Sequence, residues 1–212
     1  MVRLFRRFLL ICLIRPLAWI VIGVEVHNRS NLPDQGPAII AANHNSHVDT
    51  LLLMCLFPSH LLERVRPVAA ADHFFRSPLS AWFATRIVGA LPIERGTRSG
   101  RDVLKGCETA LANNEILLVF PEGTRGEPEV MGVFKAGIAR LAEQFPRAPI
   151  IPVYLQGAGR VLPRGARIPV PFTCSVIIGQ TIEWCGSRTA FLDDLRSAIE
   201  ALRETAPPLR WL

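Results

Sequence analysis

Short apolar runs alternate with segments of helical periodicity along most of this chain. The apolar runs, which we expect to form strands, cover residues 38–42, 68–71, 88–93, 116–120, 150–155 and 173–178. The segments with helical spacing cover residues 48–57, 78–87, 101–113, 133–145 and 188–204. This alternation predicts an α/β fold with a central, mostly parallel or mixed sheet flanked by helices. The run 116–120 has no polar position, which is typical of a central strand covered on both faces.

The amino terminus carries the longest apolar stretch. Arg3, Arg6 and Arg7 precede an apolar run over residues 8–24, which Arg15-Pro16 interrupts. At about 1.5 Å per residue this run is marginal for a hydrocarbon core about 30 Å thick. We therefore expect residues 1–24 to form a membrane-anchoring amphipathic or re-entrant helix, held in one leaflet by apolar side chains and cationic flanks, and residues 25–212 to form one catalytic domain. A helix buried in the core and a full membrane span are the alternatives.

The composition favours a protein that meets lipid. The chain has 212 residues, of which 50% are hydrophobic and 20% charged, and its mean hydropathy is +0.28. A net charge of +6 suits an anionic surface. Because no basic run with interleaved aromatic residues occurs, we expect a membrane surface and not a nucleic acid as the partner. The five scattered cysteines form no C-x-x-C pair and predict reduced core residues.

A histidine and an aspartate five residues apart follow the first predicted strand of the domain. His44 and Asp49 lie in the turn that leads into the helix predicted at 48–57. A neutral imidazole oriented by a carboxylate is a general base that can take the proton of an alcohol. His44 would be the base and Asp49 the residue that orients it. The alternative is structural: Ser46 and Asp49 form a capping box, and His44 faces solvent.

Two further loops follow predicted strands. Glu122, Gly123, Thr124 and Arg125 come directly after the strand at 116–120, where α/β proteins build ligand loops. Gly123 permits close backbone approach, and the Arg125 guanidinium suits a phosphate. Without that role this loop is an ordinary turn with a solvated arginine.

The second of these loops ends the strand predicted at 88–93. Its residues Glu94 and Arg95 form either a surface ion pair or a phosphate contact from the arginine.

Other catalytic chemistries lack support in the sequence. His44, His47 and Asp49 have a spacing that could bind a metal, but the remaining histidines supply no further ligands in a recognisable pattern. We therefore expect no metal site. A serine nucleophile is also disfavoured, because no G-x-S-x-G motif occurs.

Four blocks occur together in the chain. They are Asn43-His44 with Asp49, Gly89 with Ile93-Glu94-Arg95, Phe120-Pro121-Glu122-Gly123-Thr124-Arg125, and Ile151-Pro152-Val153. In their order and spacing they resemble the 1-acylglycerol-3-phosphate acyltransferase (lysophosphatidic acid acyltransferase) family. The second block departs from the usual pattern, since Leu91-Pro92 and Glu94 stand where an aromatic residue and often Asp occur.

The resemblance implies a glycerol-phosphate acyltransferase-like fold and an activity in phospholipid biosynthesis. It implies acyl-CoA or acyl-carrier protein as co-substrate, no cofactor, and 1-acylglycerol-3-phosphate as the membrane lipid acceptor, with phosphatidic acid as product. It also implies the roles of the site residues: catalytic His44 and Asp49, an acceptor phosphate site of Glu94, Arg95, Glu122, Gly123, Thr124 and Arg125, and a pocket wall at Pro152.

Location and acceptor follow from the same resemblance. We expect the protein at the cytoplasmic face of the inner membrane of a bacterium. Another acceptor, such as a lyso-ornithine lipid or a lysophospholipid, remains open, as does a non-catalytic lipid-binding relative. Intact His44 and Asp49 argue against the non-catalytic relative.

Overall fold

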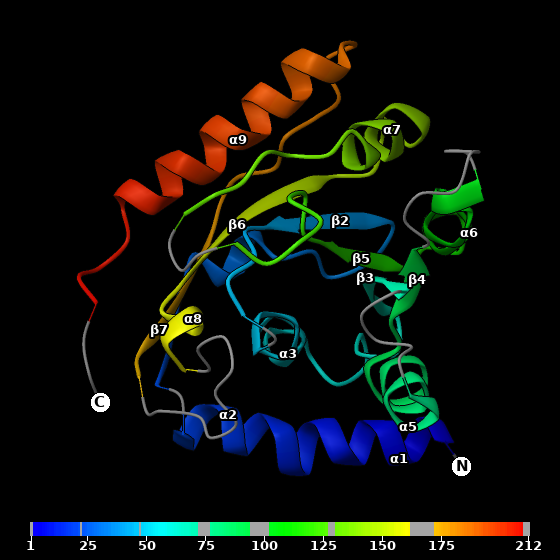
Figure 1. Cartoon of the computed structure of the whole chain (residues 1–212), viewed down its shortest axis with the longest axis vertical. Coiled ribbons are helices and arrows are strands. Elements are labelled where there is room, and N and C mark those ends of the chain that lie inside the picture. Colours follow the sequence, from blue (N-terminus) through cyan, green and yellow to red (C-terminus); the bar gives the residue numbers. More distant parts are fainter. Residues whose placement is uncertain are drawn as a thin grey trace.

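A seven-stranded sheet runs through the centre of the protein (Figure 1). The structure is a computed structural model that describes residues 2–21, 23–46, 48–71, 77–93, 102–126, 130–161 and 172–209. The strands are β1 (Val24–His27), β2 (Ala38–Ala42), β3 (Val65–Ala70), β4 (Leu91–Ile93), β5 (Ile116–Val119), β6 (Ile150–Gln156) and β7 (Cys174–Ile178). Their order is β1-β7-β6-β2-β5-β3-β4, and every pair is parallel except β6 with β7. The predicted mostly parallel sheet flanked by helices is confirmed.

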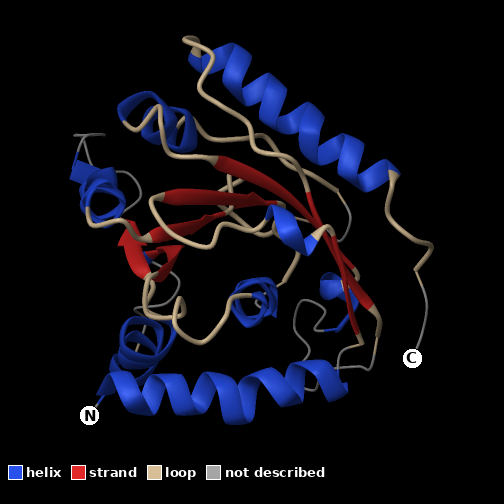
Figure 2. Cartoon of the chain, turned by 180° about the vertical axis from the view of Figure 1, so that it is seen from behind, coloured by secondary structure: helices blue, strands red, loops and turns tan. Residues whose placement is uncertain are grey.

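Helices cover both faces of this sheet, as Figure 2 shows from behind. The helices are α1 (Val2–Phe8), α2 (Arg15–Val21), α3 (Val48–Leu56), α5 (Pro78–Trp82), α6 (Lys105–Ala112), α7 (Gly137–Gln144), α8 (Ala158–Val161) and α9 (Arg188–Glu204). Two π-helical segments, Leu9–Ile14 and Phe83–Val88, continue α1 and α5. Two 3-10 turns complete the described helices, at Arg29–Asn31 and Asp102–Leu104. In the view of Figure 1, α6, α7 and α9 lie above the sheet, and α3 and the N-terminal helix lie below it.

Several element boundaries differ from the sequence expectation. The strand β1 was not predicted and pairs at the sheet edge with β7. The helix predicted at 133–145 begins only at Gly137, and the preceding stretch is bound to the loop after β5, where the amide of Lys135 donates to the carbonyl of Pro121. The strand predicted at 88–93 is shorter, since Val88 ends a helical segment that Gly89 closes in the left-handed conformation, at φ 73°.

The N-terminal helix runs past Arg15-Pro16 without a break. Before the proline it widens into π-helical geometry, in which the amide of Arg15 donates to the carbonyl of Leu10, five residues back. Proline has no N–H to donate, so a local change of register at this point is expected. Leu10 is buried in the core on one side of the helix.

The expected cationic flank of this helix is only partly present, because Arg6 points into the protein. Its guanidinium donates to the carbonyls of Val65, Ile87 and Val88. Burial, together with the charge of nearby Arg66, lowers the pKa of Arg6. The N-terminal helix therefore packs against the domain through this arginine.

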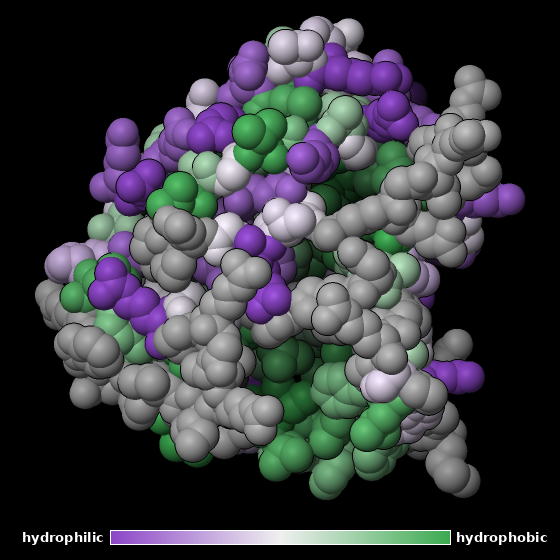
Figure 3. All heavy atoms as spheres, viewed as in Figure 1, coloured by the Kyte–Doolittle hydropathy of each residue, from purple (hydrophilic) through white to green (hydrophobic). Residues whose placement is uncertain are grey.

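The opposite side of the N-terminal helix is exposed and apolar. Phe8 and Ile20 are 63% and 79% exposed, and hydrophobic residues gather at the lower edge of the molecule in Figure 3. Leu79 and Trp82 of α5 add further exposed apolar surface. Among the described residues no helix is both long enough and apolar enough to cross a bilayer.

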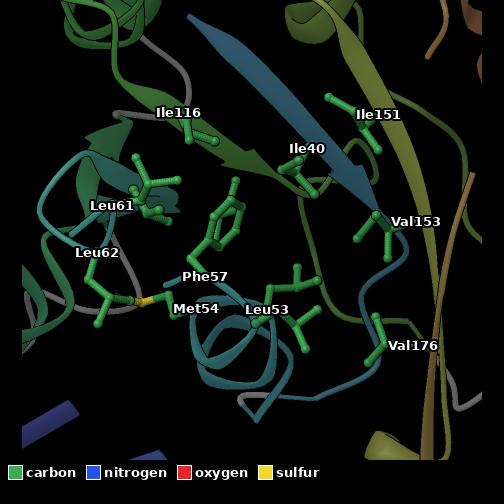
Figure 4. Close-up of a cluster of buried hydrophobic side chains, with 14 of the residues drawn as sticks. Ile40, Leu53, Met54, Phe57, Leu61, Leu62, Ile116, Ile151, Val153 and Val176 are labelled. Atoms are coloured by element: carbon green, nitrogen blue, oxygen red, sulfur yellow. The ribbon is translucent and has the colours of Figure 1, made fainter. Parts of the chain in front are cut away.

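The core lies in two layers, one on each face of the sheet. Successive residues of β2 point to opposite faces, so Ile40 packs with Leu53 and Phe57, whereas Ile39 packs against the layer of α6, α7 and α9. Figure 4 shows the first layer, in which α3 side chains meet Ile116, Ile151, Val153 and Val176 from the sheet. Every residue of β2 is buried, which explains its uniformly apolar sequence.

The cysteines are all reduced, but not all belong to the core. Cys55, Cys107 and Cys174 are buried, as predicted, whereas Cys12 and Cys185 are exposed. Burial raises the pKa of Cys55 to about 11 and that of Cys107 to about 12.

Candidate active site

Two of the four motif blocks meet because β2 and β5 are parallel neighbours. In their register Ala41 lies beside Val119, so the loops that leave both strands start at the same edge of the sheet. His44 lies three residues beyond Ala41, and Glu122 lies three residues beyond Val119. Residues that are 78 positions apart in sequence are thereby in contact: the amide of His44 donates to Glu122 Oε1 over 3.0 Å.

The structure brings His44 and Asp49 together. His44 Nδ1 lies 2.9 Å from Asp49 Oδ2. Because a carboxylate only accepts hydrogen bonds, Nδ1 carries the proton and Nε2 is left as the basic nitrogen. The Asp49 side chain is fully buried, whereas that of His44 is 18% exposed. A histidine in this state can accept a proton from a hydroxyl group.

Asp49 also fixes the turn that carries His44. Its Oδ2 accepts from the amides of Asn45 and Ser46, each over 2.7 Å. The bond to Ser46 is one half of the capping box that the structural alternative predicted, whereas Ser46 Oγ accepts from the amide of Val48 over 3.4 Å. Capping and orientation of the imidazole are therefore performed by one carboxylate, and His44 lines a cavity instead of facing open solvent.

Two asparagines, Asn43 of the first motif block and Asn45, to which the sequence assigned no role, bind the same turn to β6. The side chain of Asn43 donates to the carbonyl of Leu155 and accepts from its amide, in the manner of an added strand residue. Asn45 donates to the same carbonyl over 3.0 Å. Buried asparagines directly after an apolar strand are the signal that could have indicated this role.

The imidazole of His44 also packs against an aromatic ring. The rings of His44 and Phe120 are stacked, with centroids 4.0 Å apart and an interplanar angle of 17°. Together with the bond to Asp49 this contact fixes the plane of the imidazole.

A cavity of about 490 Å³ opens beside His44. This volume is within the range of about 300–1,000 Å³ typical of small-molecule sites. Most of its lining is apolar and comes from β3, β5, α7 and the helical segment that follows α5, including Val68, Val88, Val119 and Leu141. Arg125 and Lys135 supply positive charge to the lining.

The remaining predicted site residues divide into three groups. Gly123, Thr124 and Arg125 line the cavity with His44, and Gly123 needs its positive φ of 69° to make this turn. Glu122 is buried and is not part of the cavity lining. Glu94 and Arg95 lie outside the described residues.

Two further expectations concern Pro152 and a metal. Pro152 does not line this cavity, contrary to the expected pocket wall; it lies in β6 against Gly179. Among the described residues no group of three potential ligands could hold a metal ion. His47 lies outside the described residues.

Comparisons with known proteins agree on one group. A family model described as Acyltransferase matches residues 23–156. The chain is 29% identical over 144 residues to the chloroplastic 1-acyl-sn-glycerol-3-phosphate acyltransferase BAT2 of Brassica napus, covering 67% of this chain and 40% of that protein. It is 30% identical over 145 residues to the chloroplastic 1-acyl-sn-glycerol-3-phosphate acyltransferase LPAT1 of Arabidopsis thaliana, covering 68% and 38%. The chain thus spans about two fifths of the length of these curated relatives.

A solved structure has the same fold. The crystal structure of the 1-acyl-sn-glycerophosphate (LPA) acyltransferase PlsC from Thermotoga maritima matches with a TM-score of 0.74 and 22% identity. The match covers 98% of this chain and 83% of that one. At this identity the likeness establishes the architecture and leaves the chemistry to be argued from the site.

Proposed function

Because this chain belongs to the acyltransferase family, we propose that it transfers a fatty acyl group to the free hydroxyl of 1-acylglycerol-3-phosphate, giving phosphatidic acid. The donor would be acyl-CoA or acyl-carrier protein. The observation that carries the proposal is the buried Asp49 carboxylate 2.9 Å from the imidazole of His44, beside an apolar cavity. The names of the relatives support the choice of acceptor.

The chemistry follows from the two nitrogens of His44. With Nδ1 held by Asp49, Nε2 takes the proton of the acceptor hydroxyl while the oxygen attacks the thioester carbonyl. The carbon–sulfur bond then breaks, and the proton passes to the leaving thiolate. Asp49 stabilises the imidazolium between these two transfers.

Position contributes more than the base. A well-oriented pair of bound substrates lowers a barrier by about 7–11 kcal/mol, and a positioned base adds roughly 100- to 10,000-fold. In the proposed complex the apolar lining takes an acyl chain, and Arg125 contacts the acceptor phosphate. The guanidinium fork of arginine suits a phosphate better than a point charge does.

The experiment uses the purified full chain with labelled acyl-CoA and acyl-carrier protein and a panel of lyso-lipids. We expect transfer to 1-acylglycerol-3-phosphate in wild type and none in folded His44→Ala. The panel includes lyso-ornithine lipid and lysophospholipids with a head group, so a preference for either would replace the proposed acceptor. Turnover near wild type in His44→Ala would exclude the base, and a wild type inactive with every pair would exclude the activity.

We also propose that the protein works on a membrane surface, with the exposed side of the N-terminal helix in one leaflet. Phe8 and Ile20 on that helix and Leu79 on α5 leave large apolar side chains uncovered. Burial of such a side chain contributes about 1.5–3 kcal/mol. A lipid surface at the cytoplasmic face of a bacterial inner membrane would supply both the acceptor and this burial.

Deletion of the N-terminal helix cannot test this cleanly, because Arg6 and Leu10 belong to the domain core. Substitution on its exposed side can. Phe8→Asp with Ile20→Asp should weaken flotation with phosphatidylglycerol-containing vesicles, whereas Ala201→Asp on distant α9 should not. Equal flotation of all three proteins would contradict the proposed surface.

A further inference from the structure

Glu122 is turned away from the cavity and into the backbone. Its neighbours in sequence, Pro121, Gly123 and Arg125, line the cavity, but Glu122 itself is only 4% exposed and does not. Its two oxygens accept hydrogen bonds from two backbone amides: Oε1 from His44 over 3.0 Å and Oε2 from Gly132 over 2.7 Å. A buried carboxylate occupied in this way has no oxygen directed at a substrate in the cavity.

The main chain of His44 is held on both sides by the same segment of the chain. Its amide donates to Glu122, and its carbonyl accepts from the amide of Gly126 over 3.1 Å. Its ring stacks on Phe120. The backbone and the ring of His44 are thus both fixed from the stretch that follows β5, independently of the contact between Asp49 and Nδ1.

Glycines close around the Glu122 carboxylate. A Cβ placed on Gly132 would lie 3.0 Å from Glu122 Oε2. A Cβ placed on Gly126 would lie 3.4 Å from the same oxygen and 3.0 Å from the carbonyl of Val130. A side chain at position 132 would therefore crowd Oε2 and displace the carboxylate by a few tenths of an ångström, whereas one at position 126 would only touch it.

From these contacts we propose that Glu122 is a positioning residue for His44 and does not contact the acceptor. The proposal rests on the function proposed above, in which His44 is the base. It differs from the role that the sequence resemblance implied, in which Glu122 helps to form the acceptor phosphate site. Its physical basis is that the bond to Oε1 fixes the position of the His44 backbone amide and so of the imidazole. Catalysis is sensitive to displacements of about 1 Å in such a group.

The test compares Glu122→Gln with Glu183→Gln, an exposed glutamate before α9 that serves as the matched control. Glutamine keeps one acceptor oxygen and replaces the other by a donor, so only one of the two amides can remain bonded. We expect kcat to fall on the order of 10- to 100-fold while KM for both donor and acceptor stays within about twofold of wild type. Gly132→Ala should lower kcat in the same direction, because it displaces the carboxylate without removing it.

Two results would overturn the proposal. An acceptor KM that rises in Glu122→Gln while kcat is retained would place the carboxylate on the substrate. A lower melting temperature with unchanged kcat and KM in the folded variant would make its role structural only.

A readout that does not depend on acyl transfer separates this inference from the proposed function. In the ¹⁵N-labelled full chain, amide protons bonded to a carboxylate are shifted downfield. The resonances of His44 and Gly132 should both move upfield in Glu122→Gln and stay in place in Glu183→Gln. Unmoved resonances would refute the contact even if the enzyme is active, whereas moved resonances in a protein inactive with every substrate would refute the proposed function alone.

Discussion

Replacing Asp49 by asparagine tests the centre of the proposed mechanism, because the change removes a charge and hardly alters the shape. Oδ2 of Asp49 accepts three hydrogen bonds, from the amides of Asn45 and Ser46 and from His44 Nδ1. The amide oxygen of asparagine can keep the two backbone bonds. The bond that changes is the one to the imidazole, because asparagine lacks the charged acceptor that stabilises His44 once it has taken the proton.

The expected loss follows from that one bond. A hydrogen bond to a charged group contributes about 1.5–3 kcal/mol, and about 1.4 kcal/mol corresponds to tenfold in rate. Asp49→Asn should therefore lower kcat roughly 10- to 150-fold, and further if the asparagine amide donates to Nδ1 and reverses the tautomer. The upper limit is the whole contribution of a positioned base, roughly 100- to 10,000-fold. KM for donor and acceptor should change little, since the Asp49 carboxylate is fully buried behind His44 and does not line the cavity.

The assay is steady-state acyl transfer by the folded variant, with its circular dichroism and melting temperature measured in parallel. Asp193→Asn, on the exposed side of α9, is the matched control and should behave as wild type. A kcat within about twofold of wild type in folded Asp49→Asn would refute the reasoning. It would mean that the imidazole needs no carboxylate, so that the 2.9 Å contact serves only the cap of α3.

Three further outcomes are expected. Arg125→Ala should raise KM for a phosphate-bearing acceptor roughly 10- to 150-fold, the equivalent of about 1.5–3 kcal/mol, and leave donor KM unchanged. Arg125→Lys should restore acceptor binding only in part. A change in donor KM alone would mean that the phosphate site is assigned to the wrong residue. Arg6→Met should lower the free energy of unfolding by about 1–3 kcal/mol in denaturant titrations, because it leaves carbonyls of the 83–88 segment and β3 without their donor. An unchanged unfolding midpoint would show that these hydrogen bonds do not contribute to stability. At pH 8 a thiol reagent should label the exposed Cys12 and Cys185 in the native protein but not Cys107. The pKa of Cys107, raised to about 12, leaves almost no thiolate at pH 8. Rapid labelling of Cys107 would contradict its burial.

The sequence predicted the elements whose pattern is set by local chemistry. The strand β2 is buried on both faces, as its five apolar residues predicted. The helix α9 begins and ends where its periodicity predicted, since Ser187 caps its first turn and accepts from the amide of Ala190. The contact between His44 and Asp49 could also be predicted from the sequence, because two residues five positions apart in one turn have few possible arrangements.

Contacts between distant segments were outside that reach. The stretch at 133–136 has helical periodicity, yet it lies outside α7 and is bound through the amide of Lys135 to the carbonyl of Pro121 in another loop. Arg6 looked like a cationic flank, but the carbonyls that bind it belong to β3 and to the segment after α5, far along the chain. Propensity and periodicity describe a segment by itself, and they cannot say which unpaired carbonyl will lie nearby.

Glu122 illustrates the same division within the site. The sequence alone places it in a loop after a buried strand, where a carboxylate could face either a ligand or the protein. That it faces the protein is decided by the parallel pairing of β2 with β5, which puts the amide of His44 3.0 Å from Oε1. The sequence thus determined locally which residues are candidates for the site, whereas strand order determined their positions, because only the packed sheet brings the ends of distant strands to one edge.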